Sequence, residues 1–172
     1  MKNHPVKTAV FIATSLDGYI ARSDGNIDWL MSGENPENDD FGYGEFIASI
    51  NAIIMGRATF EKILSFPDWP YGNIPVFVLS STRRSVPVGL EGKASFTELG
   101  PIQLLSTLAS QGYNRLYIDG CKTIHSFLRE DALDELIIST IPVFIGGGIR
   151  LFGHLEKDLS FALVSSKPQE AS

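Results

Sequence analysis

Cysteine is almost absent from this sequence of 172 residues, which contains only Cys121. An internal disulfide is therefore impossible, and the disulfide-rich secreted scaffolds are excluded. Long apolar runs are also lacking, because no stretch approaches the ~20 residues that a membrane-spanning helix requires. Residues Met1–Lys7 lead into a strand-like pattern and not into the apolar segment of a signal peptide. We therefore expect a cytoplasmic protein that does not associate with membranes.

Basic residues and metal-ligand patterns are scarce as well. Fourteen Lys and Arg against twenty Asp and Glu give a net charge of −6, which argues against nucleic acid as a partner. His4, His125 and His154 are scattered, no CxxC pair occurs, and we predict no metal site. No GxSxG nucleophile motif is present, so hydrolysis has little support. The expected partner is a small-molecule substrate.

The size and composition of the chain are those of one globular unit. Hydrophobic residues make up 44% of the sequence and charged residues 20%, which is ordinary for a globular protein. A chain of this length has room for one hydrophobic core. We expect a single domain over residues 1–172 with its core in residues 6–165.

Strand-like and helix-like segments alternate through most of the chain. Strands are predicted at residues 6–14, 52–55, 75–80, 94–96, 116–119, 134–141 and 159–165. Helices are predicted at about residues 41–50, 57–64, 101–108 and 121–129. Alternation followed by consecutive strands predicts an α/β, three-layer fold: a mixed, mostly parallel sheet with helices on both faces and an antiparallel pair at one edge.

Two of the predicted strands end in a glycine that leads directly into a helix. One is Leu116-Tyr117-Ile118-Asp119-Gly120, and the other ends at Gly56, before Arg57 and Thr59. Such a turn directs free backbone N–H groups, and the positive end of a helix dipole, at whatever lies above the strand. Phosphate is a natural ligand there. The alternative is that the turns are simply tight ways to pack a helix onto the sheet.

A third polar turn follows the strand at 75–80. Residues Ser80 to Arg84 combine hydroxyls with guanidinium groups and suit a phosphate monoester, although a solvated basic turn is the simpler interpretation. Ligands of open α/β sheets bind along the carboxyl edge of the strands. One extended ligand with several phosphates would use all three turns, and a dinucleotide is the obvious choice. Cys121 either has a lowered pKa at its helix terminus or is a small residue that fits the turn.

Between Ser15 and Pro36 the sequence is rich in Gly, Asn and Asp. A long irregular loop of this kind is typical of a binding wall or lid, with a solvated connector as the alternative.

Several motifs together are similar to a known family. They are Ile12-Ala13 followed by SLDGYIA, then IDWL, IIMGRATFE, VFVLSST, LYIDG and PVFIGGGIRLF. The chain resembles the dihydrofolate-reductase-like superfamily over residues 6–165. The closer resemblance is to the C-terminal reductase domain of the bifunctional riboflavin-biosynthesis deaminase/reductase and to its small stand-alone relatives.

This resemblance implies an NADPH-dependent oxidoreductase with an eight-stranded, mostly parallel sheet, and it assigns roles to residues. Ala13 and the loop residues Asp17, Gly18, Tyr19 and Ile20 would lie against the nicotinamide. The implied phosphate contacts are Gly56, Arg57 and Thr59, with Arg57, Ser80, Ser81 and Thr82 near the adenosine 2′-phosphate. The implied pyrophosphate contacts are Asp119, Gly120, Lys122 and Thr123. Cys121 stands where the family often has a second glycine.

The substrate side departs from the resemblance. Dihydrofolate reductases hold the pteridine ring with a buried carboxylate on the first helix, and Gly42 stands at about that position here. Asp39 and Asp40 are the nearest acids to act as proton donor, with helix capping as the alternative role. Tyr19, Asp28 and Trp29 are expected to border the substrate pocket.

The resulting hypothesis is a reductase that transfers a hydride from NADPH to a small heterocyclic or ribosylamine-type substrate, either riboflavin-pathway-like or dihydrofolate-like. A non-catalytic NADPH-binding protein of the same fold and an acidic structural domain are the rival hypotheses. Apolar residues at 141–152 also predict a homodimer built on an edge strand.

Overall fold

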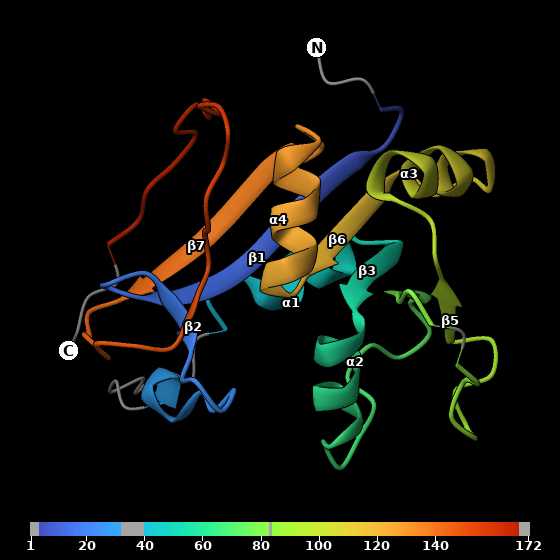
Figure 1. Ribbon diagram of the computed structural model, residues 1–172, viewed down its shortest axis with the longest axis horizontal. Helices are drawn as coiled ribbons and strands as arrows, with labels where there is room; N and C mark the ends of the chain where they lie inside the picture. Colours follow the sequence, from blue (N-terminus) through green and yellow to red (C-terminus); the bar gives the residue numbers. More distant parts are fainter. Residues whose placement is uncertain (1–3, 32–39, 83, 169–172) are drawn as a thin grey trace.

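The computed structural model describes residues 4–31, 40–82 and 84–168 (Figure 1). Six strands form one sheet in the order β5-β4-β3-β6-β1-β7, and every neighbouring pair in it is parallel. The strands of this sheet are β1 (Lys7–Ser15), β3 (Ala52–Gly56), β4 (Val76–Leu79), β5 (Ala94–Thr97), β6 (Arg115–Asp119) and β7 (Glu135–Ile141). The predicted α/β fold with a mostly parallel sheet is confirmed.

Antiparallel pairing occurs in a separate two-stranded sheet. It joins β2 (Tyr19–Ala21) to β8 (Ile149–Arg150), and a short 3-10 helix, η1 (Asp28–Met31), follows β2. The prediction of an antiparallel pair at an edge of the main sheet was therefore wrong in its location. Residues 159–165, predicted to be the last strand, form no strand in the structure.

Helices cover both faces of the main sheet, which gives three layers. On one face α3 (Pro101–Ser110) and α4 (Cys121–Arg129) pack through Leu105 and Phe127, both fully buried. On the other face α1 (Tyr43–Ala48) and α2 (Arg57–Leu64) pack through Phe46 and Phe60. Figure 1 shows α4 in front of the sheet and α1 behind it. Because helices cover both faces of the sheet, side chains on both faces of a central strand such as β3 are apolar.

The first helix is shorter than predicted. Phe41 and Gly42 have φ angles of 56° and 86°, a left-handed geometry that prevents the helix from starting earlier. It ends at Ala48, where the Ser49 hydroxyl donates to the Phe46 carbonyl oxygen at 2.6 Å. The helix therefore spans six residues instead of about three turns.

Polar contacts at the amino end of β1 join it to the start of β7. Thr8 is fully buried, its N–H donates to Asp134 Oδ2 at 2.8 Å, and its hydroxyl donates to the Ala132 carbonyl oxygen at 2.7 Å. Because a buried polar group must find a partner, these contacts help to select the pairing of β1 with β7. No helix in the described part of the chain is long and apolar enough to span a bilayer.

Candidate active site

The three polar turns predicted from the sequence lie next to one another at the carboxyl edge of the main sheet. Gly56 at the end of β3 pairs with Leu79 of β4, and Met55 pairs with Asp119 of β6. The turns after these three strands therefore start at almost the same level along the strand direction. Residues that follow β4, β3 and β6 share one rim, as the sequence predicts.

The turns after β3 and β6 interlock through two threonines. A Cβ atom at Gly56 would lie 3.0 Å from the Thr123 hydroxyl oxygen, which belongs to α4. In return, a Cβ atom at Gly120 would collide with the Thr59 hydroxyl oxygen, which belongs to α2. Gly120 also has a φ angle of 90°, which disfavours any other residue. The glycines are thus required by the approach of the two helices, whatever binds above them.

Neither helix has a side-chain cap at its start. The N-cap residues of α2 and α4 are Gly56 and Gly120, and no side chain accepts hydrogen bonds from the first N–H groups. Two sets of unpaired donors and two positive dipole ends therefore meet on the rim. Lys122 is exposed on the first turn of α4 and adds a positive charge. This arrangement favours an anion with at least two negative groups.

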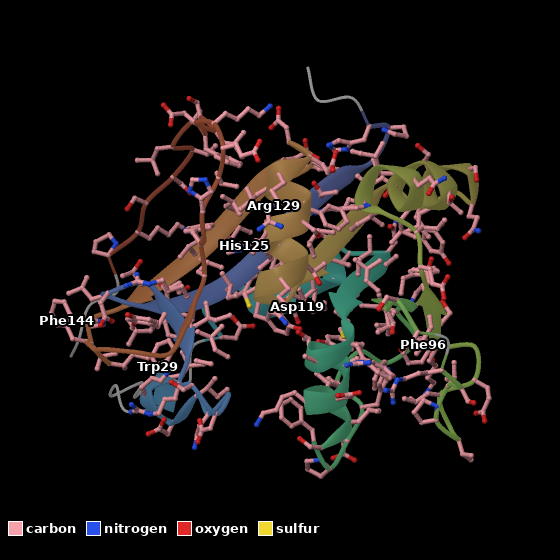
Figure 2. All side chains as sticks on the ribbon, viewed as in Figure 1. Trp29, Phe96, Asp119, His125, Arg129 and Phe144 are labelled. Atoms are coloured by element: carbon pink, nitrogen blue, oxygen red, sulfur yellow. The ribbon has the colours of Figure 1, made fainter. Side chains whose placement is uncertain are left out.

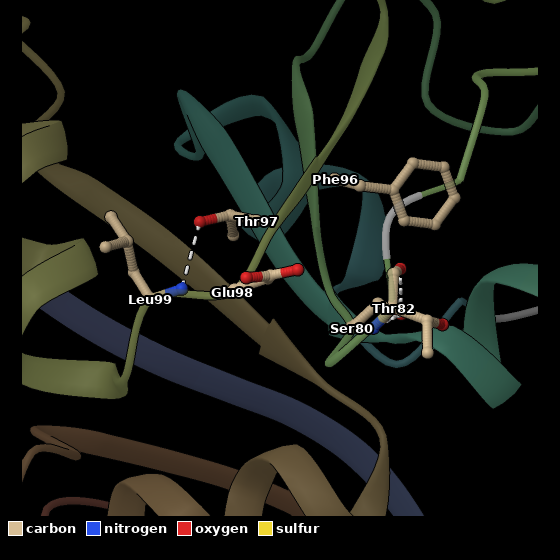
Figure 3. A pocket seen from close by; sticks show the side chains of 6 residues that line it. All are labelled: Ser80, Thr82, Phe96, Thr97, Glu98 and Leu99. Carbon is tan, nitrogen blue, oxygen red and sulfur yellow. Dashed lines mark hydrogen bonds between the residues drawn. The ribbon is translucent and has the colours of Figure 1, made fainter.

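The turn after β4 forms one wall of a hollow of about 310 Å³ between β4 and β5. The Ser80 hydroxyl donates to the Thr82 carbonyl oxygen at 2.9 Å and accepts from the Thr82 N–H at 3.3 Å. Ser81 is exposed beside it, and Arg83 lies outside the described residues. The hollow is lined by Ser80, Thr82, Phe96, Thr97, Glu98 and Leu99 (Figure 3).

The charges around this hollow have opposite signs. Arg57 at the start of α2 is exposed, and its only described ion pair is with Glu61 at 3.6 Å, a surface contact worth little free energy. Glu98 is an exposed carboxylate in the wall of the hollow itself, and the sequence offered no reason to single it out. A phosphate near Ser80 would therefore meet both an attractive and a repulsive charge.

Asp119, expected to contact pyrophosphate, has properties of an acid–base group. Burial raises the pKa of its carboxyl to about 6, and hydrogen bonds from the Gly120 N–H and the Tyr117 hydroxyl oppose part of that shift. The Gly120 N–H lies 2.8 Å from Asp119 Oδ1. The sequence analysis did not single it out as an acid–base group, although its place as the one acid in the apolar run of β6 was a signal that could have done so. Figure 2 shows Asp119 at the rim, below the first turn of α4.

Three tyrosines surround this carboxyl on the α1 and α2 face of the sheet. Burial raises the pKa of Tyr43, Tyr71 and Tyr117, and the negative charge of Asp119 raises each of them further. The Tyr117 hydroxyl donates to the Phe11 carbonyl oxygen of β1 at 3.2 Å. Phe11, Tyr43 and Tyr117 also contact the Phe46 ring, with centroid distances of 5.0 to 6.4 Å. The result is an aromatic wall with one titratable carboxyl at its centre.

The loop after β1 is fixed to the glycine turn that precedes β8. Asp17 accepts from the Ser15 hydroxyl at 2.6 Å, from the Gly146 N–H at 2.8 Å and from the Ile145 N–H at 3.3 Å. These bonds, led by that of Ser15, hold the pKa of Asp17 below its ordinary value. Asp17 is thus an ionised cross-link between two loops. Gly18 takes part through its carbonyl oxygen, which accepts from the Leu151 N–H at 3.1 Å.

The remaining residues predicted to border substrate or nicotinamide lie around the small β2–β8 sheet or at the end of β1. The Arg150 guanidinium stacks on the Tyr19 ring at 4.6 Å and donates to its hydroxyl at 3.0 Å. Asp28 forms an exposed ion pair with Arg22 at 2.5 Å. Trp29 is only 2% exposed and so belongs to the core of its loop. Ala13 in β1 and Ile20 in β2 are half-buried.

The structure describes only one of the two acids expected to supply a proton. Asp39 lies outside the described residues. Asp40 is exposed and accepts from the N–H groups of Gly44 at 2.7 Å and Gly42 at 2.8 Å. These bonds lower its pKa, which makes Asp40 a helix-starting group and a poor proton donor. Among the described residues, no group of three His, Cys, Asp or Glu side chains is placed to hold a metal ion.

Comparisons with known proteins agree with this geometry. Residues 7–170 match the model of the RibD C-terminal domain family. The uncharacterized protein YwjB of Bacillus subtilis (strain 168) is 35% identical over 164 residues, which cover 94% of this chain and 91% of YwjB. A crystal structure from Shewanella sp. PV-4, described as a riboflavin biosynthesis protein, is 46% identical with a TM-score of 0.89 and covers 94% of this chain and 92% of that one.

Two more distant structures share the fold. A deaminase/reductase for diaminohydroxyphosphoribosylaminopyrimidine and 5-amino-6-(5-phosphoribosylamino)uracil from Thermotoga maritima is 19% identical with a TM-score of 0.67. The match covers 94% of this chain and 51% of that protein. Dihydrofolate reductase from Enterococcus faecalis, solved with NADP(H) and RAB-propyl, is 19% identical with a TM-score of 0.60. The match covers 89% of this chain and 80% of that one. The fold of this chain is therefore that of dihydrofolate reductase.

Proposed function

Because the chain belongs to the RibD C-terminal domain family, we propose that it is an NADPH-dependent reductase of a small heterocyclic or ribosylamine-type substrate. When bound, NADPH supplies a hydride from C4 of its nicotinamide ring. The protein's own part is to bind and orient both molecules, to exclude water, and to hold a proton where the substrate needs one. The observation that carries the proposal is the single rim on which two uncapped helices and the Ser80–Thr82 turn meet.

The rim matches the parts of a dinucleotide. The first N–H groups of α2 and α4, with Lys122, would bind the pyrophosphate between them. The hollow beside Ser80 and Thr82 has the size for the adenosine end, and Arg57 follows Gly56 on the neighbouring strand. Such a ligand spans three neighbouring strands, which explains why all three turns are polar. The likeness in fold to a reductase that binds NADP(H) supports the same cofactor here.

Asp119 is the residue that we propose supplies the proton. Addition of hydride to the carbon of a C=N or C=O bond leaves a negative nitrogen or oxygen, which must gain a proton to complete the reduction. A carboxyl with a pKa of about 6 retains enough protonated form near neutral pH to act as that donor. It lies at the end of β6, next to β1, within the aromatic wall. Asp40 and Asp39 are not needed in this role.

The same residue bears on the choice of substrate. Glu45, the one acid within α1, is exposed, and Gly42 precedes the helix, so α1 carries no buried carboxylate for a pteridine ring. The acid of this site, Asp119, is half-buried and is supplied by a strand instead of a helix. We therefore favour a riboflavin-pathway ribosylamine over dihydrofolate as the substrate.

The proposal is tested by mixing the purified chain with NADPH and following the absorbance of the reduced nicotinamide. We expect oxidation with a riboflavin-pathway ribosylamine, slow or no oxidation with dihydrofolate, and thermal stabilisation by NADPH alone. Stabilisation without oxidation of NADPH by either substrate would favour the non-catalytic nucleotide-binding protein. No stabilisation by NADPH or NADH would contradict both hypotheses.

Cofactor placement is tested by Arg57→Ala, with Arg129→Ala as the matched control because Arg129 lies at the far end of α4 (Figure 2). If Arg57 contacts the 2′-phosphate, its loss should weaken NADPH binding by roughly tenfold or more and NADH binding much less. Equal losses for both cofactors would place the 2′-phosphate elsewhere.

A further inference from the structure

The acid at the end of β6 faces the same side of the sheet as the aromatic wall. Side chains alternate along a strand, so Asp119 points to the same face as Tyr117, which packs in the core beneath α1 and α2. Ala9 of β1 pairs with Tyr117, and two residues further along the strands Phe11 comes level with Asp119. On the other side of β6, Met55 pairs with Asp119 and is fully buried in the same core. The Asp119 side chain is therefore flanked by Phe11 and Met55.

Two tyrosines from outside the sheet reach this carboxyl. Tyr43 begins α1, and its ring meets the Phe11 ring edge-on with the centroids 5.4 Å apart. Tyr71 lies in the loop between α2 and β4, and its ring meets the Trp69 ring edge-on at 5.4 Å. Burial, and after it the charge of Asp119, raises the pKa of both tyrosines, so both hydroxyls lie within electrostatic reach of the carboxyl. Side chains from a strand, a helix and a loop thus converge on one place.

Both tyrosine rings are fixed before any ligand binds. The Tyr43 N–H donates to the Asp40 carbonyl oxygen at 2.9 Å, and the Asp40 carboxylate accepts from the N–H groups of Gly42 and Gly44 on either side. Asp40 therefore orients the start of α1 and with it the Tyr43 ring. The Tyr71 ring is held by burial in the core under α2. Rigid side chains of this kind lose little entropy when they bind a ligand.

The tyrosines of the aromatic wall differ in how their hydroxyls are used. The Tyr117 hydroxyl donates to the Phe11 carbonyl oxygen. Among the described residues, no hydrogen-bond partner exists for the hydroxyls of Tyr43 and Tyr71. Tyr71 is only 7% exposed, yet its hydroxyl oxygen is not one of the fully buried side-chain atoms that lack a partner, so this oxygen reaches solvent. A buried tyrosine normally finds a partner for its hydroxyl, and here the open position is available to a ligand.

We propose that the Tyr43 and Tyr71 hydroxyls donate hydrogen bonds to acceptor atoms of the substrate's heterocycle and hold its C=N or C=O bond beside Asp119. This inference rests on the proposed reductase function. Hydride adds to the carbon, the carboxyl proton of Asp119 goes to the nitrogen or oxygen, and the two hydroxyls keep their own protons. Their raised pKa keeps them neutral donors. They therefore select a heterocycle edge with carbonyl oxygens or unprotonated ring nitrogens over an edge with amino groups.

The test compares Tyr43→Phe and Tyr71→Phe, which remove the hydroxyls and keep the rings. Binding of the riboflavin-pathway ribosylamine is measured by calorimetry with NADP⁺ present, so that no hydride is available. Each variant should weaken this binding by roughly five- to tenfold and raise KM similarly, with kcat and NADPH binding little changed. Asp119→Asn should instead lower kcat. The matched control is Tyr113→Phe, because Tyr113 packs against Phe77 on the opposite face of the sheet.

The outcomes separate this proposal from the proposed function. Unchanged ribosylamine binding in either phenylalanine variant overturns the paired role of the hydroxyls, as does an equal loss in Tyr113→Phe or a parallel loss of NADPH binding. If the natural chain binds the ribosylamine without oxidising NADPH, the reductase function fails, and the calorimetry of the two variants still decides the role of the hydroxyls. A natural chain that binds neither the ribosylamine nor dihydrofolate overturns both proposals.

Discussion

The Thr123 hydroxyl oxygen of α4 lies 3.0 Å from the position that a Cβ atom on Gly56, at the start of α2, would occupy. Thr59 of α2 approaches Gly120 at the start of α4 in the same way. The two helix starts are therefore packed against each other by a reciprocal pair of threonine–glycine contacts. This packing brings two sets of uncapped N–H groups together, and the proposed cofactor site depends on it.

Gly120→Ala should destabilise the protein strongly. The new Cβ would collide with the Thr59 hydroxyl and would occupy a backbone geometry with φ of 90°, so we expect a loss of roughly 2–4 kcal/mol in the free energy of unfolding. Gly100→Ala is the matched control, because Gly100 is also a helix N-cap, has a φ of −70°, and has open space around its Cβ position. Urea unfolding of both variants measures the difference. Equal small losses would mean that α2 and α4 are not held as described.

Asp119→Asn should change how stability depends on pH. The ordinary pKa of an aspartate carboxyl is 3.8, and that of Asp119 in the folded protein is about 6, so the folded state binds the proton more tightly than the unfolded state does. Stability is then highest below pH 3.8 for this group and falls as pH rises to about 6, by at most roughly 3 kcal/mol. The asparagine variant should lack this fall and be more stable than the natural chain at pH 7.

Urea unfolding at several pH values between 4 and 8 gives the measurement for Asp119. Asp68→Asn is the control, because Asp68 is an exposed acid in the loop after α2. The asparagine at 119 should also lower the rate of substrate reduction while NADPH binding changes little. If the free energy of unfolding of the asparagine variant depends on pH as that of the natural chain does, the pKa of Asp119 is not raised in the folded protein.

Glu98→Gln should improve binding of NADPH more than of NADH. Glu98 lines the same hollow as Ser80 and Thr82, and its negative charge repels a 2′-phosphate while it can accept a hydrogen bond from a 2′-hydroxyl. We expect a gain of roughly three- to tenfold in NADPH affinity, about 1 kcal/mol, and little change or a loss for NADH. Fluorescence titration with both cofactors tests this, with Glu156→Gln as an exposed control. Parallel changes for the two cofactors would show that Glu98 does not face the ribose.

Asp17→Asn should loosen the glycine turn before β8. The carboxylate holds the Ile145 and Gly146 N–H groups, and an amide oxygen replaces those bonds only in part. Exchange of these two amides should accelerate by roughly tenfold, because local opening of the turn becomes easier. Because the pKa of Asp17 is depressed, the natural chain should lose the same protection only as the pH falls below about 4.

Asp24→Asn is the matched control for Asp17. Asp24 accepts from the Asn26 N–H within the same loop region and does not reach residues 145–146. It should leave their exchange unchanged. Slow exchange in Asp17→Asn would show that the glycine turn is held by other contacts.

The sequence predicted the parts of the fold that depend on local pattern. Both strand–glycine–helix turns, at Gly56 and Gly120, have the predicted geometry, because a buried strand, a glycine and an amphipathic segment are signals contained within about a dozen residues. Their meeting on one rim followed from the rule that carboxyl ends of parallel strands lie together.

Features set by distant residues were harder to predict. The short strands β2 and β8 pair across more than one hundred residues, with contacts such as the one between Asp17 and Gly146. Asp119 reads as a turn residue in the sequence, and only the burial around it, with Tyr43 and Tyr71 brought from other elements, raises its pKa. Residues 159–165 have the composition of a strand but form none in the structure, because local composition alone does not make a strand.

The position of β1 within the sheet affects how the protein folds during synthesis. Lys7 of β1 pairs with Arg115 of β6, and Ala9 pairs with Glu135 of β7, so both neighbours of this central strand are translated more than one hundred residues later. During synthesis β1 is an apolar, β-prone segment without its neighbouring strands, whereas β3 and β4 can pair as soon as both have been synthesised. β1 can therefore join the sheet only after β6 and β7 have been synthesised.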